Sequence, residues 1–152
     1  MARIDLDSTT LPEFLHRIDT IVPTAERRWG SMTLARMLAH LRITFEISLE
    51  ERATKDESWP WLLPILWVLL FEVWTDWPKG RIKASAQFLD DTAEDVERER
   101  GLLVESMQRF VERAAREPER LVLEPMLGRV SLKKWRRIHG VHVDYHLRQF
   151  GG

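Results

Sequence analysis

The sequence contains no cysteine, and this absence excludes several kinds of chemistry. A chain without cysteine forms no disulfides, offers no thiolate to a metal ion and has no thiol nucleophile of its own. An excess of positive charge is also missing, because 23 Lys and Arg residues are balanced by 24 Asp and Glu residues. A net charge of −1 creates no positive field that could hold a polyanion, so we expect no nucleic-acid partner.

Long apolar runs are missing as well. The longest one covers residues 59–71, and its 13 residues fall short of the about 20 that a membrane-spanning helix needs. No apolar run follows a basic start, as it would in a signal peptide, so we predict a cytoplasmic protein with no membrane span. An alternative interpretation places residues 59–71 on the surface of a membrane.

What the sequence does contain is a helical pattern. Apolar residues recur at three- and four-residue spacing over residues 11–22, 34–49, 96–114 and 135–147. No segment alternates strictly enough to predict a strand. We therefore predict one all-α domain over residues 1–152, a four-helix bundle with an irregular Trp-rich crossover segment.

Capping residues and prolines indicate where these helices begin and bend. Residues 59–77 are expected to form a bent third helix, because Pro60 and Pro64 each remove a backbone donor. The second helix should end near Ala53 and the fourth near Glu117. The expected N-caps, in chain order, are one of Ser8, Thr9 and Thr10, then Ser31 or Thr33, Thr92, and Ser131.

Histidines are the strongest chemical signal in the sequence. His142 and His146 are four residues apart on the last helix, so their Cβ atoms lie about 5–6 Å apart on one face. Such a pair can bind one metal ion, or it can be an exposed or hydrogen-bonded pair. A third ligand is needed, and His40 on the core side of the second helix is the candidate. The alternative for His40 is a buried histidine satisfied by hydrogen bonds alone.

Other residues are candidates for supporting roles. Gln149 and Thr44 share helix faces with the histidines and can bond a ligand or a second ring nitrogen. Tyr145 can place a phenol near the ion. Arg148 can bind a substrate anion, or its positive charge can interact favourably with the helix dipole at the end of the last helix. We expect His139 to be solvated, with a supporting role at the ion as the alternative, and His16 to be exposed.

Tryptophan is abundant, with seven residues, five of them between positions 59 and 77. We expect these five to be core or dimer-interface side chains. The alternative is a lid over an apolar substrate pocket, to which Trp61, Trp67 and Trp74 would contribute.

Four stretches of the sequence resemble a known superfamily. They are RWGSMT leading into MLAHL at residues 28–41, WPKG at 77–80, EPMLGRVS leading into Trp135, and HVDYHLRQFG at 142–151. The chain resembles the DinB-like superfamily of four-helix metal-binding proteins, in a bacterial branch that is a domain of unknown function. Two positions depart from that branch, since Glu124 and Tyr145 stand where it tends to have histidine.

The resemblance implies a metal triad of His40, His142 and His146. It also implies a divalent transition metal (zinc, nickel or iron), a small-molecule substrate and a homodimer. The function implied is a transferase that uses a low-molecular-weight thiol, or a hydrolase that uses water. The alternative is a non-enzymatic bundle whose Trp-rich segment, residues 59–77, binds a protein partner or an apolar ligand.

Overall fold

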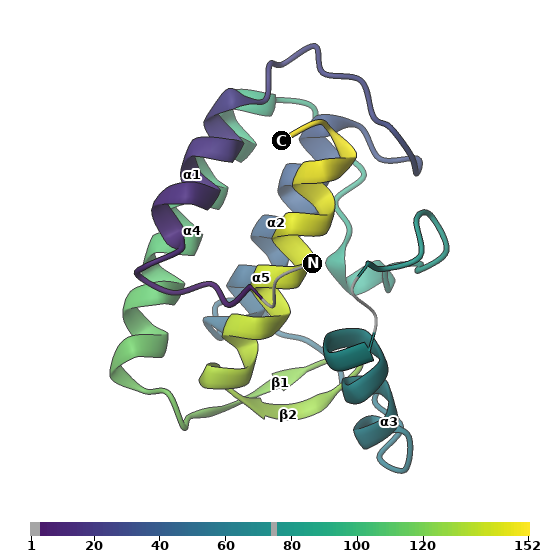
Figure 1. The fold of residues 1–152 in the computed structure, drawn as a ribbon, viewed down its shortest axis with the longest axis vertical. Coiled ribbons are helices and arrows are strands. Elements are labelled where there is room, and N and C mark those ends of the chain that lie inside the picture. Colours follow the sequence, from purple (N-terminus) through teal and green to yellow (C-terminus); the bar gives the residue numbers. More distant parts are fainter. Residues whose placement is uncertain (1–3, 74–75) are drawn as a thin grey trace.

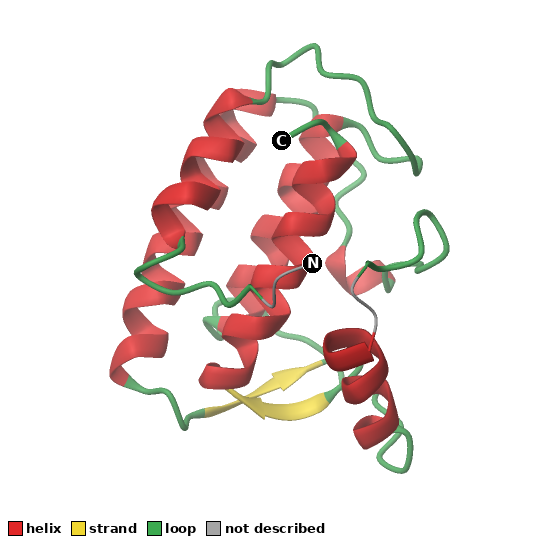
Figure 2. Cartoon of the chain, viewed as in Figure 1, coloured by secondary structure: helices red, strands yellow, loops and turns green. Residues whose placement is uncertain are grey.

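The structure is a computed structural model that describes residues 4–73 and 76–152. Its elements are shown in Figure 1, and Figure 2 shows that helices dominate over one small sheet. The expectation of a mostly helical fold is therefore confirmed. The four longer helices are α1 (Leu11–Thr20), α2 (Leu34–Ser48), α4 (Val96–Arg116) and α5 (Leu132–Gln149).

These four helices lie side by side around a shared apolar core. In Figure 1, α1 and α5 run upward and α2 and α4 run downward. Helix α2 is the most enclosed, because 13 of its 15 residues are buried, and it packs most extensively against α4. The side chains of Phe45 on α2 and Phe110 on α4 meet edge to face in the core, with ring centroids 5.7 Å apart. The site described below lies where α2 faces α5.

Three of the four expected N-cap positions are confirmed and one is wrong. Thr10 stands at the N-cap of α1, although its side chain caps no backbone N–H group there. The side chains of Thr33 and Ser131 accept hydrogen bonds from backbone N–H groups of α2 and α5. Helix α4 begins after Asp95, whose carboxylate accepts from the Arg98 N–H at 2.9 Å. Thr92 bonds Asp90 instead, in the turn before the helix.

Helix α2 ends at Ser48, five residues before the expected end.

The sequence predicted no strand, and the structure has two. Strands β1 (Leu121–Glu124) and β2 (Gly128–Ser131) form an antiparallel hairpin between α4 and α5. Each has only four residues, too few for alternation to be recognised in a sequence. Gly128, at φ +72°, adopts the left-handed conformation that closes the turn. The hairpin carries Val122 and Glu124 on its buried face.

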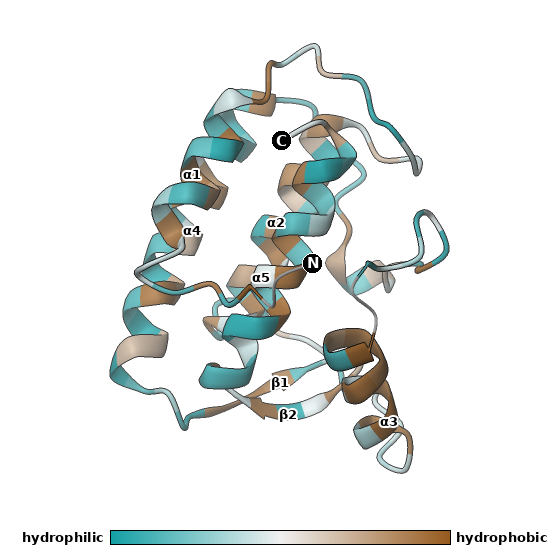
Figure 3. Cartoon of the chain, in the orientation of Figure 1, coloured by the Kyte–Doolittle hydropathy of each residue, from teal (hydrophilic) through white to brown (hydrophobic). Residues whose placement is uncertain are grey.

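The Trp-rich segment differs from the bent helix that was expected. Helix α3 (Leu63–Val68) starts only at Leu63, because Pro64 fits a first helical turn, where no N–H is needed. A π-helical turn, η1 (Leu69–Val73), follows directly, and a 3₁₀ turn, η2 (Ala86–Phe88), lies further along. Figure 3 shows α3 as a strongly hydrophobic element beside the long helices.

Two tryptophans of this segment are not in the core. Trp59 is 60% exposed and Trp61 is 70% exposed, so a position in the core is wrong for both, and a position in a dimer interface stays a prediction. Trp74 lies outside the described residues. Within the part of the chain that the structure describes, no helix combines the length and apolar character that crossing a membrane requires.

Candidate metal centre

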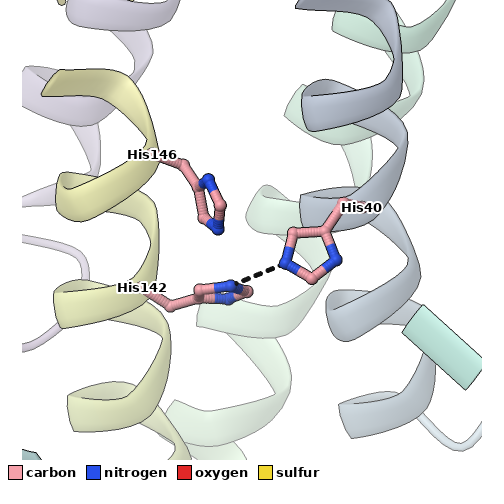
Figure 4. Close-up of side chains that lie close together, drawn as sticks. All are labelled: His40, His142 and His146. Carbon is pink, nitrogen blue, oxygen red and sulfur yellow. Dashed lines mark hydrogen bonds between the residues drawn. The ribbon is translucent and has the colours of Figure 1, made fainter. Parts of the chain in front are cut away.

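The structure brings His40, His142 and His146 together. His40 comes from the middle of α2, and the other two come from successive turns of α5 (Figure 4). One ring nitrogen from each histidine lies within 4.8 Å of the other two. The closest pair is His40 Nε2 and His142 Nε2, at 2.9 Å. The spacing read from the sequence thus places two rings on one face of α5, opposite the third.

Hydrogen bonds on the outer side of two rings determine which nitrogen carries the proton. His40 Nδ1 lies 2.9 Å from the carbonyl oxygen of Phe88, and a carbonyl can only accept, so Nδ1 is the donor. His146 Nδ1 likewise donates to Gln149 Oε1 at 3.0 Å. In neutral rings each Nε2 therefore carries a lone pair rather than a proton, which is how metal-binding histidines are normally oriented.

Burial keeps all three rings neutral. Desolvation lowers the pKa of His40, and the bond to the Phe88 carbonyl offsets only part of that effect. Burial lowers the pKa of His142 well below its usual range and the pKa of His146 to about 3. Neutral imidazoles are the form that binds a metal ion, so the rings need not lose a proton first at neutral pH.

The distances fit a shared divalent ion. Two nitrogens bound at about 2.0–2.1 Å in a tetrahedral arrangement lie about 3.3–3.4 Å apart. The observed separations, 2.9 Å for the closest pair and at most 4.8 Å, bracket that value. An all-nitrogen donor set suits zinc, nickel or iron and does not select among them. The three residues therefore fit the kind of ion that the sequence resemblance implied.

A cavity of about 320 Å³ opens onto the three histidines. Most of its lining is apolar and comes from α3, η1, the hairpin and α5. The polar groups are few: the histidines, Thr44, Lys83, Glu124 and Tyr145. An apolar cavity with a small number of polar groups is typical of a small-molecule site. The apolar and aromatic lining residues include Leu66, Leu70, Phe71, Trp77, Trp135 and Ile138.

Comparison with family models matches residues 1–151 to one family, described as a protein of unknown function, DUF1569. The chain belongs to the DUF1569 family. No curated protein and no solved structure matches it. The roles of the residues in this DUF1569 chain therefore have to be argued from its own geometry.

Gln149 connects the site to the Trp29–Gly30 turn, which precedes α2. Its Oε1 accepts from His146, and its Nε2 donates to the carbonyl oxygen of Trp29 at 2.6 Å. This contact requires glycine at position 30. A Cβ there would lie 2.5 Å from Gln149 Nε2, and the backbone has a φ of +80°. Through Gln149, the Trp29–Gly30 turn and α5 together fix the orientation of the His146 ring.

Tyr145 and Thr44 both line the cavity, in different ways. The Tyr145 hydroxyl oxygen accepts from Trp29 Nε1 and from the Gly80 N–H, each at 3.1 Å. Its own proton is therefore free to be donated into the cavity. Thr44 donates to the Leu41 carbonyl at 2.7 Å, so its oxygen keeps only acceptor capacity for a ligand. Neither side chain bonds a histidine ring of the triad.

Arg148 and His139 lie away from the cavity. Arg148 forms ion pairs with Asp144 and Asp76, at 2.9 Å and 3.0 Å, and is not among the lining residues. His139 was expected to be solvated, and that expectation is wrong, because its side chain is completely buried. It stacks on Phe45, with ring centroids 3.8 Å apart, and bonds Ser48 Oγ at 2.9 Å. His16 is exposed, as expected.

Two of the three tryptophans named from the sequence do not line the cavity, and the third, Trp74, lies outside the described residues. Trp61 is exposed, and Trp67 packs against Phe71 and beneath the Lys134 ammonium without lining the cavity. Trp77 and Trp135 line it instead. Trp77 donates to the Leu70 carbonyl at 2.7 Å and lies against His142, with ring centroids 6.1 Å apart.

Sequence reasoning missed two residues of the site. Phe88 holds His40 through its backbone carbonyl, which leaves no trace in a sequence. Glu124 was noted only as a departure from a branch that tends to have histidine there, and the structure places it on the cavity wall. Its position directly after the apolar residues of β1 was the available signal.

Proposed function

We propose that this protein is a divalent-metal-dependent enzyme of the DinB-like type, with His40, His142 and His146 as the metal ligands. The observation that carries the proposal is the convergence of three neutral ring nitrogens on the wall of an apolar cavity. A divalent ion on three imidazoles keeps a coordination position open and lowers the pKa of a water or thiol placed there, as a Lewis acid does.

The fold supports the same proposal. Four long helices run up, down, down and up in chain order (Figure 1). The ligands come from the second and the last of these helices. This arrangement is what we expect of a DinB-like four-helix bundle, with the hairpin and the Trp-rich segment added to one end.

The chain's own residues define how a substrate would be handled. A cavity of about 320 Å³ with an apolar lining favours a small molecule that has an apolar body and one polar reacting group. Trp77 and Trp135 exclude water from that body. The Tyr145 hydroxyl can donate a hydrogen bond to the polar group. Because the chain has no cysteine, a thiol nucleophile would enter as a cosubstrate.

Metal content is the test of this function. Untagged protein purified without chelators is measured by mass spectrometry, beside a His142→Ala, His146→Ala variant and a His16→Ala control. We expect about one transition-metal ion per chain in wild type and control, and loss in the double variant with its helical circular dichroism unchanged. The absence of bound metal after reconstitution with zinc, nickel or iron would contradict the proposal.

A second function is favoured by the exposure of Trp59 and Trp61. Exposed apolar side chains that lie close together often form a contact surface, and we propose that these two, in the turn before α3, bind a partner, with a second copy of the chain tested first. Sedimentation velocity of wild type should show a dimer that Trp59→Glu, Trp61→Glu converts to a monomer. A monomeric wild type at all accessible concentrations would exclude the homodimer.

A further inference from the structure

Glu124 is an unusual residue in this fold. It is only 7% exposed, and it lies on the buried face of β1 together with Val122. Over residues 4–73 and 76–152, no basic side chain forms an ion pair with it. Buried carboxylates are rare unless a cation accompanies them, because removing the charge from water is costly. An ion pair therefore does not explain why this carboxyl group is inside the protein.

Only one of its two oxygens serves the hairpin turn. Glu124 Oε2 accepts from the N–H groups of Met126 and Leu127, at 2.8 Å and 2.5 Å. No donor among the described residues bonds Oε1. These two N–H contacts hold the carboxyl group in one orientation, and they leave its other oxygen available to a molecule in the cavity.

The cavity wall places Glu124 and the three histidines around one space. The hairpin contributes Glu124, α2 contributes His40, and α5 contributes His142, His146 and Tyr145. Lys83 lies on the same wall, before η2. Asp56 and Glu57, in the segment before α3, add negative charge from outside. Burial and, to a smaller extent, the two acidic neighbours raise the pKa of Glu124 to about 7, against the pull of the two N–H bonds.

We propose that Glu124 is the acid–base residue of this cavity, exchanging a proton with a substrate or nucleophile bound between its carboxyl group and the three histidines. The inference rests on the proposed metal-dependent function and adds a role to it. A carboxyl group of this kind is needed there because the three histidines cannot serve as bases while their Nε2 lone pairs hold an ion.

The proton balance of such a step is simple. A water or thiol bound in the cavity loses its proton to the Glu124 carboxylate, which becomes a carboxylic acid. The nucleophile then forms its bond to the substrate, and the bond to the leaving group breaks with its electron pair. Glu124 returns the proton to the leaving group and is a carboxylate again, so no further oxidant, reductant or proton donor is required.

The proposal is tested by titrating Glu124 itself, without any substrate. Protein labelled with ¹³C at glutamate carboxyl groups is followed by nuclear magnetic resonance from pH 4 to 9, metal-free and after addition of zinc. Glu124→Gln identifies the signal and keeps an oxygen that can accept the two turn N–H bonds. Glu57→Gln is the matched control, since it removes a nearby carboxylate outside the cavity. Zinc uptake is measured on the same samples with a competing chromophoric chelator.

We expect one glutamate signal with a midpoint of about 7, absent in Glu124→Gln and retained in Glu57→Gln. Bound zinc should raise the acid dissociation constant of the Glu124 carboxyl group about tenfold or more, because a cation in the same cavity favours the carboxylate. A titration midpoint near the ordinary pKa of about 4.3 for every glutamate signal would overturn the proposal. So would a midpoint that zinc does not move although zinc is bound. Failure to take up zinc would instead refute the metal site, and with it the role of Glu124.

Discussion

At the scale of single residues, the candidate site depends on side chains that are not themselves ligands. His40 is oriented by the Phe88 carbonyl and His146 by Gln149. Such outer hydrogen bonds orient each ring and make its other nitrogen a better ligand. The geometry of the triad is therefore only as rigid as these partners.

Replacing Gln149 should weaken metal binding without removing a ligand. The Gln149→Leu variant keeps the size of the side chain but loses the acceptor for His146 Nδ1 and the donor to Trp29. We expect its zinc affinity to fall by about 10- to 100-fold, measured by competition with a chromophoric chelator. Gln108→Leu, at an exposed position of α4, is the control and should bind zinc as wild type does. Equal affinities in the two variants would show that Gln149 does not orient the ring.

The residues of the site could be read from the sequence to very different degrees. His142 and His146 lie on one helix, so their spacing alone places them on one face. His40 was a candidate from its place on the core side of its helix, but only the resemblance implied that it joins them, because its distance from α5 depends on how two helices pack. His139 was misjudged, since the ring that fills the space between Phe45 and Trp135 is decided by packing. Glu124 depends on a hairpin whose strands were too short to be predicted, so its place after three apolar residues was not recognised as a signal.

At the scale of elements, two helical glycines have opposite surroundings. Gly101 on α4 is exposed, and a Cβ there would meet nothing within 4 Å. Gly140 on α5 is buried, and a Cβ there would lie 2.0 Å from the backbone oxygen of Ile4. The N-terminal segment thus crosses α5 at Gly140, and the Leu6 N–H donates to the Arg136 carbonyl nearby, at 2.9 Å.

These two positions give a matched pair of alanine substitutions. Gly101→Ala should raise the free energy of unfolding by about 1 kcal/mol, because alanine is the better helix former. Gly140→Ala should lower it, because the N-terminal segment has to move away from α5. Urea unfolding followed by circular dichroism measures both. A stabilising Gly140→Ala would mean that the segment does not pack across this helix.

The lengths of the elements also explain why the long helices were predicted better than the two strands and the start of α3. Helices of ten or more residues carry a repeated apolar pattern, and Thr33 and Ser131 were recognisable as caps. Strands β1 and β2 have four residues each, which is too short for a pattern. The start of α3 was placed too early, since Pro60 and Pro64 were both read as interior residues, whereas Pro64 lies in the first turn.

At the scale of the whole molecule, buried titratable groups make stability depend on pH. Burial lowers the pKa of His139 well below 6.5 in the folded chain, so below that pH the unfolded chain binds the extra proton. Folding stability from this group is complete above about pH 6.5 and is lost as the pH falls. Glu124 acts in the opposite sense. Its folded pKa of about 7 exceeds the ordinary 4.5, so its contribution is complete below about pH 4.5 and is lost as the pH rises.

Variants of these two residues should separate the contributions. In metal-free protein between pH 6.5 and 5, we expect His139→Phe to weaken the loss of stability on acidification, by up to about 1.4 kcal/mol per pH unit. Glu124→Gln should make that loss steeper, because the opposing contribution is removed. Urea unfolding at several pH values gives both slopes. A slope that His139→Phe leaves unchanged would show that the buried ring already accepts a proton in the folded state.

The central claim is that one divalent ion binds to all three histidines and keeps a position open toward the cavity. X-ray absorption spectroscopy of the zinc-loaded protein tests it most directly, because imidazole rings give a distinct multiple-scattering pattern. The account predicts three imidazole nitrogens at about 2.0–2.1 Å and at least one further light atom, with two imidazoles remaining in His40→Ala. Zinc without imidazole scattering, or a spectrum that His40→Ala does not change, would contradict it.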